Sequence, residues 1–149
     1  MQNQMTVIFD ANTENEAFAR NTVAAFCALL DPTVDQINDI KTAVSEAVTN
    51  CIVHAYPDKS KKGKVTITTT ISENSVHIVI SDTGVGIDDV KSAMQPFFTT
   101  KPEQERSGMG FTVMESFTDN LTVERNTPSG TIVSMTKTIR GAGWKQSKH

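Results

Sequence analysis

The chain has 149 residues, a length that fits one domain with a single hydrophobic core. Its formal net charge of −3 argues against a nucleic-acid-binding surface, which normally carries a basic face. No apolar run approaches the ~20 residues that span a membrane, and the N-terminus lacks the basic and apolar regions of a signal peptide. We therefore expect a cytoplasmic protein that contacts neither nucleic acid nor membrane.

The first part of the chain predicts one strand followed by two helices. Residues 6–10 read as a short strand, and apolar residues recur at helical spacing over 18–30. Asp31 and Pro32 predict a helix stop and a new start, with Asp31 as the cap and Pro32 at the first helical position. The second helix is expected over about residues 33–55.

Two cysteines, Cys27 and Cys51, fall on the apolar stretches of these helices. Buried free cysteine behaves as a small hydrophobic residue, and disulfides are rare in the cytosol. The three histidines have no metal-ligand spacing with the cysteines. We expect two reduced core residues and no zinc site.

The rest of the chain predicts four strands, a long loop and one short helix. Residues 65–72 alternate as a half-buried strand, Glu73 and Asn74 turn the chain, and the next strand extends to about residue 82. The segment 95–107 contains two prolines and no clean period, which predicts a loop or lid, and a helix is expected over 108–117. Two closing strands are expected around 121–125 and 131–138.

This order favours an α+β domain over residues 1–140, and a flexible basic tail is expected over 141–149. Because hairpins dominate the expected strand pairings, the sheet should be largely antiparallel with helices on one face.

The first motif that carries chemistry is Asp82-Thr-Gly84-Val-Gly86. Asp82 shares the strand phase of the inward-facing Ile78 and Ile80, so its carboxylate should point toward the core, where a buried charge needs a partner. Gly84 and Gly86 allow close approach of a ligand to the backbone. Asp82 can then accept a hydrogen bond from the amino group of a planar base. The alternative is a capping aspartate in a glycine turn.

The second motif is an acid–amide pair on the second long helix. Glu46 and Asn50 are i,i+4 neighbours on a ridge that borders the apolar stripe. An amide oxygen can ligate Mg²⁺, and a carboxylate can act as a general base toward a hydroxyl. A solvated polar helix face is the alternative.

The third motif is a helix start preceded by hydroxyl and cationic side chains. Backbone N–H groups at a helix N-terminus bind phosphate, and the preceding residues suit a closing phosphate clamp; ordinary surface charge is the alternative for its two cations. The expected phosphate contacts are Thr99, Lys101, Arg106, Ser107, Gly108, Met109 and Gly110.

One further candidate lies at the start of the last strand. Thr131 follows Gly130 and shares strand phase with Val133 and Met135, so its hydroxyl can point inward. That hydroxyl would bond to the base or to a water held by Asp82. The alternative is a plain β-branched strand residue.

Taken in order, Glu46…Asn50, Asp82-x-Gly84-x-Gly86, Gly108-x-Gly110 and Gly130-Thr131 resemble the motifs of the GHKL ATPase superfamily. That superfamily includes gyrase, a heat-shock chaperone, mismatch-repair ATPases and histidine kinases. The resemblance implies a Bergerat fold: a two-layer α+β sandwich whose mixed, mostly antiparallel sheet carries helices on one face. It also implies that ATP or ADP binds between the helices and a lid.

Longer strings of residues narrow the resemblance. The segments 14–20, 30–33, 45–50, 98–103 and 105–111 resemble the anti-sigma F factors of spore-forming bacteria. Such a protein holds a sporulation sigma factor of the sigma F type away from RNA polymerase. It also uses ATP to phosphorylate a serine of an anti-anti-sigma partner, a STAS-type phosphoacceptor. A homodimer is implied as well.

The resemblance also implies roles for individual residues. Glu46 would be the general base, Asn50 the Mg²⁺ ligand and Asp82 the adenine contact, and Arg20 would lie on the partner-binding face. Three other functions stay open: a nucleotide-gated sigma-binding clamp without kinase activity, a detached ATPase domain of a histidine kinase, and a general-stress anti-sigma kinase of the same family.

Overall fold

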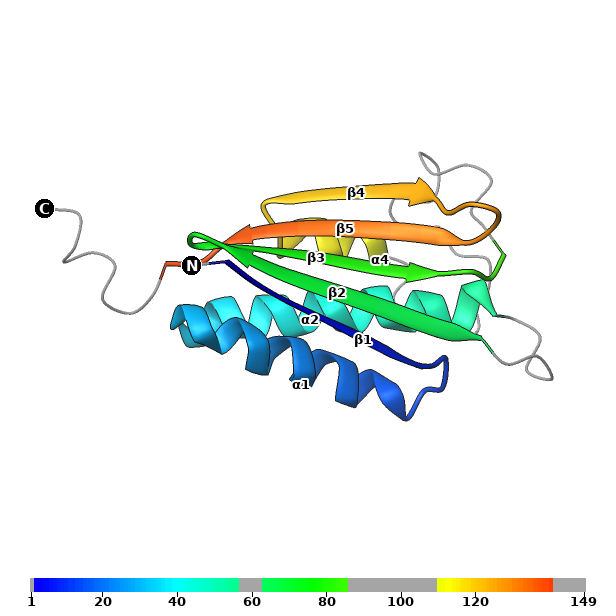
Figure 1. Ribbon diagram of the computed structural model, residues 1–149, viewed down its shortest axis with the longest axis horizontal. Helices are drawn as coiled ribbons and strands as arrows, with labels where there is room; N and C mark the ends of the chain where they lie inside the picture. The colour runs from blue at the N-terminus through cyan, green and yellow to red at the C-terminus, as the bar shows by residue number, and fades with distance from the viewer. Residues whose placement is uncertain (1, 57–62, 86–109, 141–149) are drawn as a thin grey trace, which may run out of the picture.

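A five-stranded sheet has the described helices packed on one of its faces (Figure 1). The computed structural model describes residues 2–56, 63–85 and 110–140. In chain order the elements are β1 (Gln2–Asp10), α1 (Asn15–Cys27), the 3₁₀ turn η1 (Ala28–Leu30), α2 (Val34–Asn50), the π-helical turn η2 (Cys51–Ala55), β2 (Lys64–Ser72), β3 (Ser75–Asp82), α4 (Gly110–Ser116), β4 (Asn120–Arg125) and β5 (Thr131–Thr138). The predicted two-layer α+β sandwich is confirmed.

The strands are ordered β1-β2-β3-β5-β4, and each of the four described pairings is antiparallel. This bears out the largely antiparallel sheet predicted from the hairpins. The register sets Asp82 opposite Val65, and Ser81 opposite Ile132. The last residues of β3 therefore lie beside the first residues of β5, although about 50 residues separate them in sequence.

The core lies between the sheet and the helices, as the alternation of apolar residues predicts. Every second residue of β2 and β3 is buried, and α2 buries the stripe formed by Ile40, Val44, Ala47 and Val48. Helix α2 packs against both α1 and α4. Both cysteines are free and buried, as predicted, and burial raises the pKa of Cys27 to about 12.

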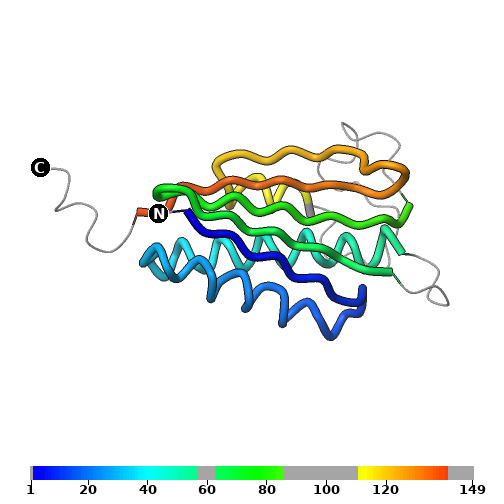
Figure 2. Tube along the Cα trace, in the orientation of Figure 1, coloured from blue at the N-terminus to red at the C-terminus, as the bar shows by residue number. Residues whose placement is uncertain are grey.

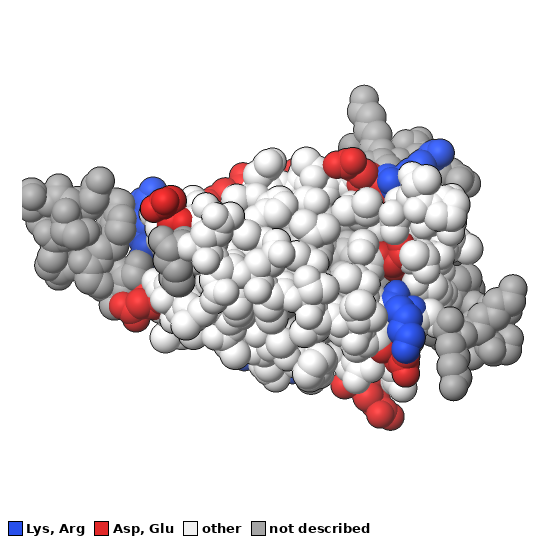
Figure 3. Space-filling view, in the orientation of Figure 1, with Lys and Arg blue, Asp and Glu red and all other residues white. Residues whose placement is uncertain are grey.

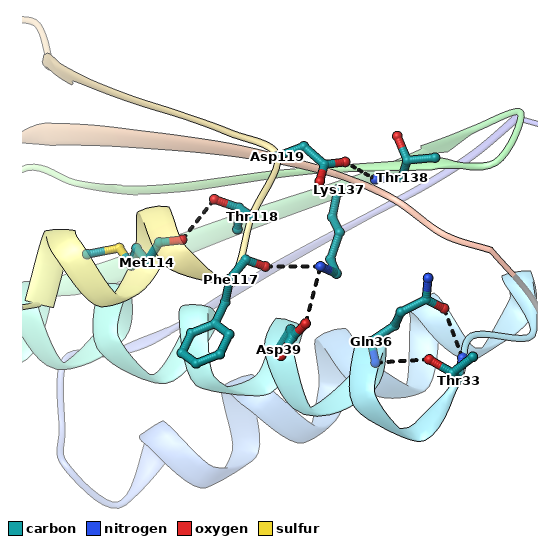
Figure 4. A network of polar contacts seen from close by, with 9 residues as sticks. All are labelled: Thr33, Gln36, Asp39, Met114, Phe117, Thr118, Asp119, Lys137 and Thr138. Atoms are coloured by element: carbon teal, nitrogen blue, oxygen red, sulfur yellow. Dashed lines mark hydrogen bonds and ion pairs between the residues drawn. The ribbon is translucent and has the colours of Figure 1, made fainter.

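The start of α2 differs from the sequence prediction. Thr33 is the N-cap: its hydroxyl accepts from the Gln36 N–H (3.2 Å), and the Gln36 side chain accepts from the Thr33 N–H (2.9 Å; Figure 4). Such a capping box satisfies two backbone donors at once. Asp31 instead adopts a left-handed conformation (φ 52°). Its assignment as the cap was wrong because Thr33, two residues later, has the partner it needs in Gln36.

A lysine joins three elements at the end of the sheet where β5 finishes (Figure 4). The Lys137 ammonium donates to the Phe117 carbonyl oxygen just after α4 (3.2 Å) and lies 3.4 Å from the Asp39 carboxylate of α2. Its side chain is only 13% exposed. A cation close to the last carbonyls of a helix is favourable, and here it fixes α4 against α2.

The opposite face of the sheet has no helix of the described residues on it and is almost uncharged (Figure 3). Hydroxyl side chains dominate its centre, where Thr6 contacts Thr68 (3.0 Å) and Gln4 donates to Thr70 (2.8 Å). In this view the charged side chains gather toward the two ends of the molecule.

None of the described helices is long and apolar enough to cross a membrane.

One buried hydroxyl provides a test of the core packing. Thr69 is fully buried on β2, and within the described residues its Oγ1 is the buried side-chain atom without a hydrogen-bond partner. A buried unsatisfied polar group costs about 1–3 kcal/mol. We expect Thr69→Val to raise the free energy of unfolding by about 1 kcal/mol in urea denaturation. The control, Thr68→Val, removes a bonded hydroxyl on the open face, and an equal gain there would contradict the assignment.

Candidate functional site

Most of the sequence motifs that fall within the described residues lie together at one end of the sheet (Figure 2). Helix α2 runs the length of the sheet and continues into η2, which ends beside the end of β3. Strand β5 begins at this same end, and α4 begins nearest to it. The fold therefore gathers the acid–amide helix, the first glycine motif and the start of the last strand.

Asp82 occupies the centre of this end of the sheet. It is only 4% exposed, so its side chain points inward as the strand phase predicts. Its Oδ1 accepts the backbone N–H of Gly84 (3.1 Å) and of Thr131 (3.2 Å). Burial raises the pKa of Asp82, whereas hydrogen bonding from these two amides and from the Cys51 thiol acts to lower it.

The chain after α2 packs against the first glycine motif through the π-helical turn η2. The last residue of η2, Ala55, accepts a hydrogen bond at its carbonyl oxygen from the Val85 N–H (2.8 Å). A Cβ on Gly84 would come within 2.0 Å of the same oxygen, so only glycine fits there. π-Helical turns occur often at functional sites, and this one joins α2 to the residues after Asp82.

The loop between β4 and β5 holds the Asp82 backbone from the other side. Asn126 donates its side-chain amide to the Asp82 carbonyl oxygen (2.8 Å). Gly130 has φ +107°, and a Cβ there would lie 2.0 Å from that oxygen. Tyr56 adds a further tie, because its hydroxyl accepts the Thr83 N–H (2.9 Å) and donates to the Lys64 carbonyl oxygen (2.7 Å). Asp82 is thus fixed by both its main chain and its side chain.

Glu46 and Asn50 lie one turn apart on α2, and both are half-buried. This is the position that helix phase predicts, at the border between the buried stripe and the exposed face. Asn50 directly precedes η2, which packs against β3, the strand that ends at Asp82. The arrangement sets a carboxylate and an amide oxygen on the helix that leads to the buried aspartate.

Arg20 lies apart from this group, on α1. Its guanidinium pairs with the Glu16 carboxylate one turn earlier, and the Ser45 hydroxyl of α2 donates to the same carboxylate (3.0 Å). Arg20 is 34% exposed in its side chain. Glu16 therefore holds an accessible cation in a defined position.

Several predicted phosphate contacts lie outside the described residues, as does Gly86. Gly110 is described as the first residue of α4. The remaining predictions that fall outside are Thr99, Lys101, Arg106, Ser107, Gly108 and Met109.

Sequence reasoning missed two contributors to the site. Asn126 and Tyr56 were not singled out, and their contacts join residues 44 and 27 positions apart. Thr131 reaches Asp82 directly through its backbone N–H, and the bond of its hydroxyl to the base or to a water stays a prediction.

Comparison with known proteins identifies the class to which this arrangement belongs. The family model of the histidine kinase-like ATPase domain matches residues 9–137, so the chain belongs to that family, and an ATPase domain implies nucleotide binding. A crystal structure of the RsbU and RsbW domains of a Mycobacterium tuberculosis protein shares the fold, with a TM-score of 0.66 and 17% identity. That match covers 92% of this chain and 32% of the longer one.

Within this class the chain is an anti-sigma F factor family member. It is 53% identical to the anti-sigma F factor of Bacillus licheniformis over 137 residues, covering 92% of this chain and 93% of the relative. It is 56% identical to that of Caldanaerobacter subterraneus over 137 residues, covering 92% and 94%. The resemblance drawn from the motifs is confirmed.

Proposed function

We propose that this protein binds and inhibits a sporulation sigma factor, and that it inactivates its anti-anti-sigma partner by phosphorylating a serine with ATP. The relatives' name, anti-sigma F factor, supports the sigma partner. The observation that carries the kinase activity is the placement of Glu46 on the helix that leads to the buried Asp82.

Asp82 would accept a hydrogen bond from the amino group of the adenine base. Its Oδ1 is occupied by two backbone amides, which orient the carboxylate before any ligand arrives. Such preorganisation lowers the cost of ordering on binding. Gly84 and Gly130 let the backbone of Ala55 and of Asp82 approach closely, so the main chain around the carboxylate is tightly packed.

Glu46 would accept the proton of the partner's serine hydroxyl while the serine oxygen forms its bond to the γ-phosphorus. The bond from that phosphorus to the β,γ-bridging oxygen breaks, and ADP leaves with the bond's electron pair. Phosphoryl transfer depends mainly on positioning and charge stabilisation. Asn50 fits Mg²⁺ through its amide oxygen, since this ion prefers oxygen ligands and shares its shell with phosphates. When bound, Mg²⁺ would neutralise phosphate charge.

A direct experiment tests the kinase proposal. The protein is incubated with labelled Mg-ATP and the anti-anti-sigma partner, and transferred phosphate is analysed for acid stability. Acid-stable phosphoserine on the partner supports the proposal. Transfer of no phosphate, with ATP still bound, would favour a nucleotide-gated clamp. Acid-labile phosphate would favour a histidine kinase-type domain. Selective binding of a stress sigma factor would favour a general-stress anti-sigma kinase.

Arg20 provides a prediction for the partner-binding face. Its guanidinium is accessible and held by Glu16, so it can pair with an acidic group of a partner. We expect Arg20→Ala to weaken sigma binding at least about tenfold while leaving ATP affinity unchanged, measured by titration calorimetry. The control is Arg125→Ala on β4, at the far edge of the sheet from α1. Equal losses of sigma affinity in the two variants would contradict a specific role of Arg20 in sigma binding.

We also propose a homodimer that associates through the open face of the sheet. This face carries hydroxyl and amide side chains with few charges, and Ile8 is 65% exposed on it. A charge buried between two copies without a partner is costly. We expect Val79→Lys, at the centre of the face, to give monomers in light-scattering chromatography. Asn38→Lys, exposed on α2, should remain dimeric, and a dimeric Val79→Lys variant would contradict this interface.

A further inference from the structure

The peptide group that joins Asp82 to Thr83 is held by two side chains from distant parts of the chain. The Asp82 carbonyl oxygen accepts from the Asn126 side-chain amide (2.8 Å), and the Thr83 N–H donates to the Tyr56 hydroxyl (2.9 Å). In a trans peptide the C=O and N–H groups point in opposite directions from one rigid plane. Tyr56 and Asn126 therefore hold the same plane from opposite sides.

This peptide lies just beyond the point where β3 stops pairing with β5. The last pair of that ladder is Ser81 with Ile132, so the backbone groups that follow need partners of another kind. Ser129 supplies a further one, because its hydroxyl donates to the Thr83 carbonyl oxygen (3.0 Å). Side chains thus continue to fix the backbone of the first glycine motif after the ladder has ended.

The Tyr56 hydroxyl is itself held in place. It donates its hydrogen to the Lys64 carbonyl oxygen (2.7 Å) while it accepts the Thr83 N–H, so it acts as donor and acceptor at once. The tyrosine ring packs directly against Gly63, where a Cβ would come within 2.3 Å of it. Tyr56→Phe would keep this ring contact and remove both hydrogen bonds.

The Asn126 amide is oriented by a second contact. Its Oδ1 accepts the Thr127 N–H (2.9 Å), which leaves the NH₂ group facing the Asp82 carbonyl oxygen. The backbone N–H of Asn126 donates to the Gly130 carbonyl oxygen (2.9 Å), so the residue is anchored in the loop between β4 and β5. Asn126→Asp would still accept the Thr127 N–H, but it would present an oxygen to the Asp82 carbonyl where a donor is needed.

We infer that Tyr56 and Asn126 are positioning residues for the nucleobase site: together they fix the Asp82–Thr83 peptide and so the direction of the Asp82 carboxylate toward the 6-amino group of adenine. Asp82 Oδ1 accepts the Gly84 N–H across this peptide (3.1 Å), so rotation of the plane would separate the two groups. Holding the plane before the ligand arrives lowers the cost of ordering on binding. The inference rests on the proposed function, because it takes Asp82 as the base contact.

The first experiment needs no nucleotide. Hydrogen exchange of the Thr83 amide is followed by NMR in the unmodified protein and in Tyr56→Phe. We expect exchange in the variant to be about fivefold faster or more, because this N–H loses its hydrogen bond. The Val85 amide, which donates to the Ala55 carbonyl oxygen, is the internal reference. If the Thr83 rate relative to that of Val85 is unchanged, the contact and the inference are overturned.

The second experiment measures base selection. Dissociation constants are compared for ATP and for purine riboside triphosphate, which lacks the 6-amino group, so that phosphate contributions cancel in the ratio. We expect Tyr56→Phe and Asn126→Asp each to reduce the preference for ATP about fivefold. The matched control is Asn120→Asp, which adds the same charge at the exposed start of β4 and should keep the preference. Equal weakening of both nucleotides by Tyr56→Phe and Asn126→Asp would overturn the inference and assign both residues to folding only.

The double variant Tyr56→Phe/Asn126→Asp tests whether both side chains act through one peptide. We expect its loss of preference to be well below the product of the two single losses, because each substitution releases the same plane. Single losses that multiply in the double variant would overturn this shared action.

The outcomes also separate the inference from the proposed function. If the unmodified protein binds both triphosphates equally, the base contact of Asp82 is wrong, and base selection through Tyr56 and Asn126 falls with it. The exchange rate of Thr83 then still reports whether Tyr56 holds the peptide. If ATP is preferred but both single variants retain the full preference, the base contact stands and the positioning role is wrong.

Discussion

Glu46→Ala is expected to slow phosphoryl transfer to the anti-anti-sigma partner by about 10²–10⁴-fold, the usual contribution of a general base. ATP affinity should change little, because the proposed base contact lies at Asp82, at the end of β3. Single-turnover transfer of labelled phosphate measures the rate, and calorimetry measures nucleotide binding.

Two variants control for the loss of a carboxylate on α2. Glu46→Gln keeps the shape of the side chain without its basicity and should be as inactive as Glu46→Ala. Asp35→Ala removes an exposed carboxylate in the first turn of the same helix and should retain full activity. A Glu46→Ala variant that transfers phosphate at the normal rate would show that another group takes the serine proton, or that none is needed.

Asp82→Asn is expected to reduce ATP affinity by about 100-fold or more while the fold persists. An asparagine carbonyl can still accept the Gly84 and Thr131 amides, so the local hydrogen bonds survive. Its NH₂ group, however, presents a donor toward the donor of adenine. Calorimetric titration with ATP measures the loss, with Asp35→Asn as the matched control.

The same variant tests the electrostatics of the site through its pH dependence. Burial raises the pKa of Asp82 above the ordinary value of 3.8, so the folded state binds this proton more tightly than the unfolded chain does. The resulting stability is fully present below 3.8 and is lost as the pH rises through the folded-state pKa. Thermal unfolding of Asp82→Asn should lack this contribution. If the thermal stabilities of the unsubstituted protein and of Asp82→Asn change with pH in parallel, the raised pKa of Asp82 is contradicted.

Patterns formed by residues close together in the sequence predict some features of the site and not others. Strand phase alone predicts that Asp82 points inward, because alternate residues of a strand face the same side. Helix phase likewise sets Glu46 and Asn50 on one ridge. The prediction of Asp31 as the cap of α2, by contrast, was wrong. The choice between Asp31 and Thr33 depends on which side chain finds a hydrogen-bond partner, and Gln36 is the partner of Thr33.

The sequence by itself determined the strand and helix periods, the inward direction of Asp82 and the motif order that identifies the family, because each depends on residues close together in the chain. Only the tertiary structure decided what holds Asp82 in place. Thr131 is 49 residues away and Asn126 is 44 residues away. Such contacts follow from strand register and from the packing of α2 on the sheet, which no local pattern specifies.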